Sequence, residues 1–178
     1  GGLPVKRVVV GKTAQGALLF AYTALVLAGT LLVEGRPGVV TNLVPFDDLA
    51  RLRASAGSAG ILSSRFVLGL LGMVGNLAMF AVWGFLAWKF VDGRGRSRLR
   101  NHAEVVFFGL VFSVGIETVQ FFLPTRAADV NDVFWNVVGA LLGASLTHRL
   151  PVRAVRIVVT LLLFAAAIRL AQADLKRW

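Results

Sequence analysis

Long apolar blocks separated by short polar segments dominate the pattern along the chain. Each block is close to the roughly 20 residues that cross the hydrocarbon core of a bilayer as a helix. The blocks lack the strict alternation of a membrane barrel, so helices are the structure that satisfies their backbone in lipid. The pattern predicts an all-α integral membrane bundle of about five transmembrane helices, in a single domain over residues 1–178. The predicted helices are residues 14–33, 66–91, 103–123, 130–150 and 154–173.

The polar segments between the blocks differ in charge. The N-terminal segment, residues 92–102 and residues 148–156 are basic, and basic loops are retained in the cytoplasm. This pattern predicts a multi-pass membrane protein with a cytoplasmic N-terminus. Segments 34–65 and 124–131, which hold acidic residues beside their arginines, then face the outside.

The long outer segment contains "TNLVPFDDLARLRA", residues 41–54. A proline followed by acidic residues is typical of a helix N-terminus. We expect a short helix here, on the outer side, that rests on the membrane interface through Leu49, Leu52 and Ala56. The following "SAGSAG", residues 55–60, has the composition of a flexible connector.

Small residues recur in the second, third and fourth apolar blocks at spacings that let helix backbones approach closely in lipid. We therefore expect these three helices to form a compact core. The residues concerned are Gly69, Gly72 and Gly75, then Gly109 and Ser113, and finally Gly139 and Gly143.

Composition narrows the possible chemistry. The chain has no cysteine, which excludes disulfides, thiolate metal sites and a cysteine nucleophile. Its formal charge of +10 comes from 19 basic and 9 acidic residues. Because the basic residues flank apolar blocks, we interpret them as topology signals and as contacts for lipid headgroups. The expected partner is therefore the bilayer rather than a nucleic acid.

One stretch, "GIETVQFFLPTRAADVNDVFWNVVGALLGA" (residues 115–144), combines apolar blocks with many polar groups. Glu117 and Gln120 share one helix face, and Asp132 and Asn136 share a face of the next helix. Asn76 adds an amide from the second block. Polar groups facing hydrocarbon are costly. We therefore expect these side chains to line a cavity that opens to the outer surface.

Several chemistries fit this set. Glu117, Asp129 and Asp132 are candidate catalytic groups, because paired carboxylates act as general acid and base. Carboxylates with amide oxygens also suit a hard cation, although no calcium-loop pattern is present and the sequence leaves metal and cofactor undetermined. Arg126 has the planar fork that clamps a phosphate or carboxylate. The candidate ligand-binding residues are Asn76, Gln120, Arg126 and Asn136.

A purely structural role is the alternative. Arg126 would then pair with Asp129 or Asp132, and Glu117 would hydrogen-bond to neighbouring amides. The histidines, His102 and His148, fall on the predicted cytoplasmic side, which makes a Ser-His-Asp hydrolase or a histidine-ligated zinc site at the outer surface improbable.

The sequence resembles the VanZ-like family of membrane proteins in three motifs between residues 41 and 144. These are "NLVPF" (residues 42–46), "GNLAMFAVWGFL" (residues 75–86) and the pattern E-x-x-Q, R-x-x-D-x-x-D, x-x-x-N-x-x-G in residues 117–143. One departure is Val82-Trp83, where many members have a proline before the glycine. The family's signature polar positions correspond here to Asn76, Glu117, Gln120, Arg126, Asp129, Asp132 and Asn136.

The resemblance implies a protein of a bacterial cell membrane that is linked to reduced susceptibility to teicoplanin-type glycopeptide antibiotics, without a defined chemical mechanism. Three functions fit. The first is an outward polar pocket that binds or modifies a cell-envelope component, such as a lipid-linked cell-wall precursor or a lipoglycopeptide. The second is an outer-leaflet enzyme that uses Glu117, Asp129 and Asp132 on a lipid-linked or glycan substrate. The third is a non-catalytic structural membrane partner. Whether the protein is an enzyme stays open.

Overall fold

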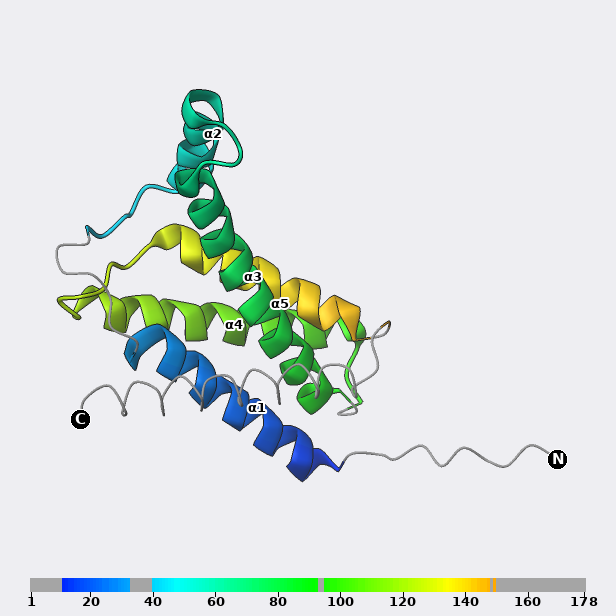
Figure 1. Ribbon diagram of the computed structural model, residues 1–178. Coiled ribbons are helices and arrows are strands. Elements are labelled where there is room, and N and C mark those ends of the chain that lie inside the picture. Colours follow the sequence, from blue (N-terminus) through cyan, green and yellow to red (C-terminus); the bar gives the residue numbers. More distant parts are fainter. Residues whose placement is uncertain (1–10, 33–39, 93–94, 148, 150–178) are drawn as a thin grey trace, which may run out of the picture.

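A computed structural model describes residues 11–32, 40–92, 95–147 and 149 (Figure 1). The described chain is all-α and contains no strand, which confirms the predicted fold class. The predicted helix at residues 154–173 lies outside the described residues. The elements are α1 (Lys12–Leu27), which continues as a π-helix η1 (Ala28–Leu32), α2 (Asp47–Ala59), α3 (Ser64–Val91), α4 (Arg98–Phe121) and α5 (Val130–Leu146).

Among the described residues, three helices are long and apolar enough to cross a bilayer. They are α1 together with η1, with 21 residues, α3 with 28 and α4 with 24. The shorter α5 is equally apolar but has 17 residues and ends at Leu146, earlier than the predicted limit of 150. Serine side chains cap the N-termini of two of these helices. Ser63 and Ser97 accept hydrogen bonds from the backbone N–H groups of Phe66 and Arg100, respectively.

Close contact between α3 and α5 forms the centre of the bundle. Three glycines make it possible: a β-carbon at Gly84, Gly139 or Gly143 would overlap the backbone of the facing helix. Gly109 of α4 packs beside the same face, against the β-carbon of Ala140. The predicted core of the second, third and fourth apolar blocks is thereby confirmed.

Other small residues have different roles from those predicted. Gly72 and Gly75 would meet no atom within 4 Å if they carried a β-carbon, so they do not mediate helix packing. Gly69 faces Leu52 of α2 and does not contact a membrane-length helix. The spacing of the glycines does not reveal which face of α3 meets α5. Gly84 lies on that face, but the predicted set does not include it.

Aromatic side chains connect α1, α3 and α4. The ring of Trp83 stacks on Phe112, with 5.7 Å between centroids, and its Nε1 donates to the hydroxyl of Thr23 at 3.1 Å. The hydroxyl of Tyr22 donates to the carbonyl of Met79 at 2.9 Å. Trp83 is therefore a core residue, and α3 runs unbroken through the position where many VanZ-like sequences have proline.

Two lysines, Lys12 and Lys89, connect helix ends at one end of the bundle. The ammonium of Lys12 donates to the carbonyls of Lys89, Phe90 and Asp92 at the end of α3. Lys89 in turn donates to the carbonyl of Thr147, just beyond α5, at 3.2 Å. Cations near the carbonyls of a helix C-terminus are stabilised by the helix dipole. These contacts therefore hold α1, α3 and α5 together at this end.

The helix α2 extends at the opposite end of α3 (Figure 1). It begins at Asp47 and continues to Ala59, so the prediction of a flexible connector at residues 55–60 was wrong. Leu52 packs on Gly69, and Ser58 donates to the carbonyl of Ala54 at 2.8 Å. This contact with α3 outweighs the weak helix propensity of the serines and glycine. The helix ends where Gly60 adopts a φ of +83°.

We predict that Gly143→Ala destabilises the bundle by about 1–3 kcal/mol, because the added methyl group forces apart two backbones in contact. Thermal unfolding of the purified protein in detergent, followed by size-exclusion chromatography, measures the effect. Gly115→Ala is the matched control, since its β-carbon would meet nothing within 4 Å. Equal stability of the two variants would contradict the packing described here.

Candidate functional site

The segment before α2 and the turn before α5 pair with each other. The N–H of Asn42 donates to the carbonyl of Ala128 at 2.9 Å, and the N–H of Val130 donates to the carbonyl of Asn42 at 3.1 Å. The side-chain amide of Asn42 also donates to both carboxylate oxygens of Asp129, at 3.2 and 3.1 Å. Two segments that are 87 residues apart in sequence are thereby joined at the end of the bundle opposite the basic segments.

Asn131 completes this junction. Its amide nitrogen donates to the carbonyl of Val44 at 3.2 Å, and its amide oxygen accepts the N–H of Phe46. Phe46 precedes α2 with a φ of 61°, the left-handed region that is uncommon for a large side chain. The ring of Phe46 packs edge-on against Phe134, with 5.1 Å between centroids. Asn131 and Phe134 thus hold the backbone at the entry to α2.

Asp129 is the centre of the network. Its carboxylate caps α5 by accepting the backbone N–H of Asn131 at 2.9 Å, and it accepts the amide nitrogen of the same residue at 2.8 Å. Its own N–H donates to the buried carboxylate of Glu117 at 2.8 Å. Arg51 of α2 lies 3.7 Å from Asp129 and 3.0 Å from Asp47. Segments of α2, α4 and α5 therefore converge on one residue.

Two further carboxylates face this centre. Asp132, in the first turn of α5, faces the side-chain amide of Asn76 of α3 and lies within electrostatic range of Asp129 and Asp48. Glu117 is within range of Asp129 and Asp132. Asp48 accepts a hydrogen bond from the indole of Trp135 at 2.6 Å. The structure thus brings four acidic side chains from α2, α4 and α5 together.

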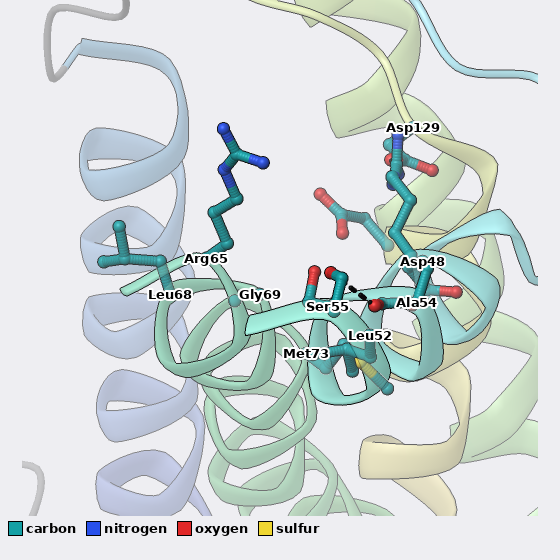
Figure 2. Close-up of a pocket in the computed structure, with 13 residues that line it drawn as sticks. Asp48, Leu52, Ala54, Ser55, Arg65, Leu68, Gly69, Met73 and Asp129 are labelled. Carbon is teal, nitrogen blue, oxygen red and sulfur yellow. Dashed lines mark hydrogen bonds and ion pairs between the residues drawn. The ribbon is translucent and has the colours of Figure 1, made fainter. Parts of the chain in front are cut away.

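A cavity of about 590 Å³ opens beside these acids, between α2 and the first half of α3 (Figure 2). Its polar lining comes from α2, the start of α3 and the start of α5. Leu52, Leu68 and Met73 form an apolar part. The charged and hydroxyl side chains that line it are Asp48, Arg51, Ser55, Ser58, Arg65, Asp129 and Asp132.

The candidate site residues proposed from the sequence differ in whether they line the cavity. Asp129 and Asp132 line the cavity, while Glu117 and Asn76 lie behind them in direct contact. Gln120 donates to the carbonyl of Thr30 in η1 at 3.0 Å. Asn136 donates to the hydroxyl of Ser113 at 2.9 Å, buried between α4 and α5. Arg126 lies in the turn between α4 and α5 and is not among the residues that line the cavity.

Sequence reasoning missed the contribution of α2 and the start of α3. Asp48, Arg51 and Arg65 were assigned to an interfacial segment and carried no role in the pocket. The four-residue spacing of Asp47 and Arg51 did signal an ion pair on one helix face. The pairing of Asn42 with Asp129 has no local signal, because it joins two turns through tertiary structure alone.

The carboxylates do not form a metal centre of a familiar kind. Within residues 11–32, 40–92, 95–147 and 149, no group of three histidine, aspartate or glutamate side chains is arranged to hold a metal ion. The acids instead accept hydrogen bonds from amides, an indole and backbone N–H groups. What the arrangement offers is a set of acceptors for a ligand with N–H or O–H donors.

A helical bundle with membrane-length apolar helices and a charged cavity at one end defines a multi-pass membrane protein with a polar site. A family model described as VanZ/LLP1 matches residues 18–152, which is most of the chain. The protein belongs to this family, as the three sequence motifs indicated. Comparison with curated proteins and with solved structures gave no match.

We predict that Asn131→Ala speeds backbone amide exchange in residues 42–46 by about tenfold, the effect of losing the two bonds to Val44 and Phe46. The N–H of residue 131 still donates to the Asp129 carboxylate that caps α5, so the helix itself persists. Hydrogen–deuterium exchange with mass spectrometry measures the change. Leu43→Ala is the control, because that exposed side chain makes no hydrogen bond. Unchanged exchange in the Asn131 variant would show that the segment is held by other contacts.

Proposed function

We propose that this membrane protein holds a component of the cell envelope in the cavity between α2 and α3, on the outer side of the membrane. Binding or modification of that component would reduce susceptibility to teicoplanin-type glycopeptide antibiotics, the property that the family resemblance implies. One observation carries the proposal: acidic and basic side chains from three helices line a single cavity at one end of a bundle of apolar helices.

The outward orientation is supported by the distribution of basic residues. Lys12 and Lys89 tie the ends of α1, α3 and α5 together beside the arginine-rich segment 92–102. The cavity belongs to the other end of α3, where α2 and the turn before α5 meet. If the basic end is cytoplasmic, the cavity opens outside.

A labelling experiment tests this orientation. Because the chain has no cysteine, single cysteines report one position each. We predict that a membrane-impermeant maleimide labels Gly57→Cys in intact cells, and labels Leu99→Cys only after the membrane is permeabilised. Both positions are exposed, so accessibility within the protein is matched. Labelling of Leu99→Cys alone in intact cells would reverse the proposed topology.

Catalysis at the outer leaflet is the second candidate. It is favoured by the proximity of Glu117, Asp129 and Asp132, because neighbouring carboxylates in unequal surroundings suit acid and base roles. Binding without catalysis uses the same groups as hydrogen-bond acceptors. For Gln120 and Asn136, the contacts with Thr30 and Ser113 support a role in holding helices together.

Susceptibility of a bacterial host that expresses the protein tests the function. We predict that Asp132→Asn abolishes the reduction in susceptibility to a teicoplanin-type glycopeptide, because a carboxylate of the cavity becomes a neutral amide. Glu117→Gln keeps an oxygen for the N–H of Asp129, so it removes charge while keeping the junction. Loss of effect in both variants favours catalysis, whereas loss in Asp132→Asn alone favours binding.

The control is Asp92→Asn, which removes an exposed carboxylate at the basic end. Immunoblots of membrane fractions establish that all variants reach equal levels. The proposal fails if Asp132→Asn, present at the level of the unmodified protein, still reduces susceptibility in full. If leucine at Gly139 and Gly143 removes the effect while the acid variants keep it, a structural partner is the better description.

A further inference from the structure

Carboxylates without a cationic partner lie at the inner wall of the cavity. Arg51 is the cation near Asp129, and it is shared with Asp47. Among the described residues, Asp48 and Asp132 have no cation within ion-pair distance. Asp48 accepts hydrogen bonds from the indole of Trp135 and from the N–H of Leu49, and Asp132 faces the neutral amide of Asn76. Two carboxylates that line a cavity and lie within electrostatic range of each other leave a negative wall. A ligand cation would neutralise it.

The opposite side of the cavity is positive. Arg65, in the first turn of α3, lies across the opening from Asp48 and Asp129 (Figure 2). Within the part of the chain that the structure describes, Arg65 forms no ion pair. Its guanidinium presents planar donors of the kind that bind phosphate. The cavity therefore presents acceptors on one side and an anion-binding group on the other.

An apolar path leads away from this charged region along α3. Leu68 and Met73 line the cavity, and the exposed side chains of Leu71 and Val74 continue on the same helix. Gly72, which also lines the cavity, leaves open space beside the helix, since its β-carbon would meet nothing within 4 Å. This surface suits an acyl chain lying against the helix.

We propose that the cavity binds a lipid whose headgroup carries a primary ammonium next to a phosphate, as in phosphatidylethanolamine. The ammonium lies at Asp48 and Asp132, the phosphate at Arg65, and an acyl chain follows Leu68 and Leu71. This inference rests on the proposed function, because it names the class of envelope component that the pocket takes.

The carboxylate wall selects a primary over a quaternary ammonium. A primary ammonium has three N–H donors for the oxygens of Asp48 and Asp132, whereas a choline headgroup has none. A phosphatidylglycerol headgroup lacks the cation and brings its negative charge toward the acids. Charge-assisted hydrogen bonds are the strongest that this wall offers, so the order of preference is ethanolamine, choline, then glycerol.

Native mass spectrometry of the full chain tests the preference with added lipids of matched acyl chains. We expect phosphatidylethanolamine adducts to exceed phosphatidylcholine adducts at least about tenfold, because choline loses every charge-assisted hydrogen bond to the carboxylates and one such bond contributes about that factor. N-monomethyl and N,N-dimethyl phosphatidylethanolamine remove one donor at a time, so binding should fall stepwise. This series uses the unmodified protein and does not depend on any variant folding.

Two variants locate the site. Asp132→Asn should reduce the preference for ethanolamine over choline, because the carboxylate of Asp48 alone remains for the ammonium. Arg65→Gln should weaken all phospholipid adducts without changing their order. The controls are Asp92→Asn at the other end of the bundle and Arg53→Gln, an exposed α2 residue that does not line the cavity. Both controls should retain the full preference.

Equal adducts of the three lipids, or a preference for phosphatidylglycerol, would overturn the inference and indicate contact with bulk lipid only. Antibiotic susceptibility of the host cells tests the proposed function separately. If the lipid preference fails while Asp132→Asn still loses its effect on antibiotic susceptibility, the pocket functions with another ligand. If the preference holds while susceptibility never depends on Asp132, the protein binds lipid and the proposed function is wrong.

Discussion

The hydrogen-bond network around Asp129 is the interaction on which the polar end of this protein depends. A turn between two apolar helices exposes backbone groups that lipid cannot satisfy. Asp129 caps α5, its N–H is accepted by Glu117, and its neighbours pair with Asn42. The same bonds attach the segment that enters α2. The entry to the cavity-forming helix is therefore fixed by the residue that begins α5.

Close glycine packing determines where that network lies. Because Gly84, Gly139 and Gly143 allow the backbones of α3 and α5 to touch, the first turn of α5 lies beside Asn76 of α3. The polar contact between Asn76 and Asp132 depends on this backbone proximity. In lipid, where apolar burial gives little drive for helix association, shape complementarity and interhelical hydrogen bonds both contribute. The core and the site are consequently parts of one packing arrangement.

The predictable part of the molecule follows from rules that act locally. Apolar length identified the membrane helices, and the cost of polar groups in lipid selected Glu117, Asp129 and Asp132, which the structure brings together. Tertiary contacts decided the rest. Whether residues 55–59 are helical depends on their packing against α3, and the face of α3 that meets α5 includes Gly84 rather than Gly72. The role of Asn42 depends on a partner far away in sequence.

The hydrogen-bonding capacity of each acid distinguishes structural from functional carboxylates. A carboxylate offers about four acceptor positions. Asp129 uses its oxygens for hydrogen bonds from the backbone and side-chain nitrogens of Asn131 and from Asn42, and Arg51 adds an ion pair at 3.7 Å. Asp132 lines the same cavity and faces the side-chain amide of Asn76. Asp129 thus maintains the site, while Asp132 retains the acceptor capacity that a ligand or a proton requires.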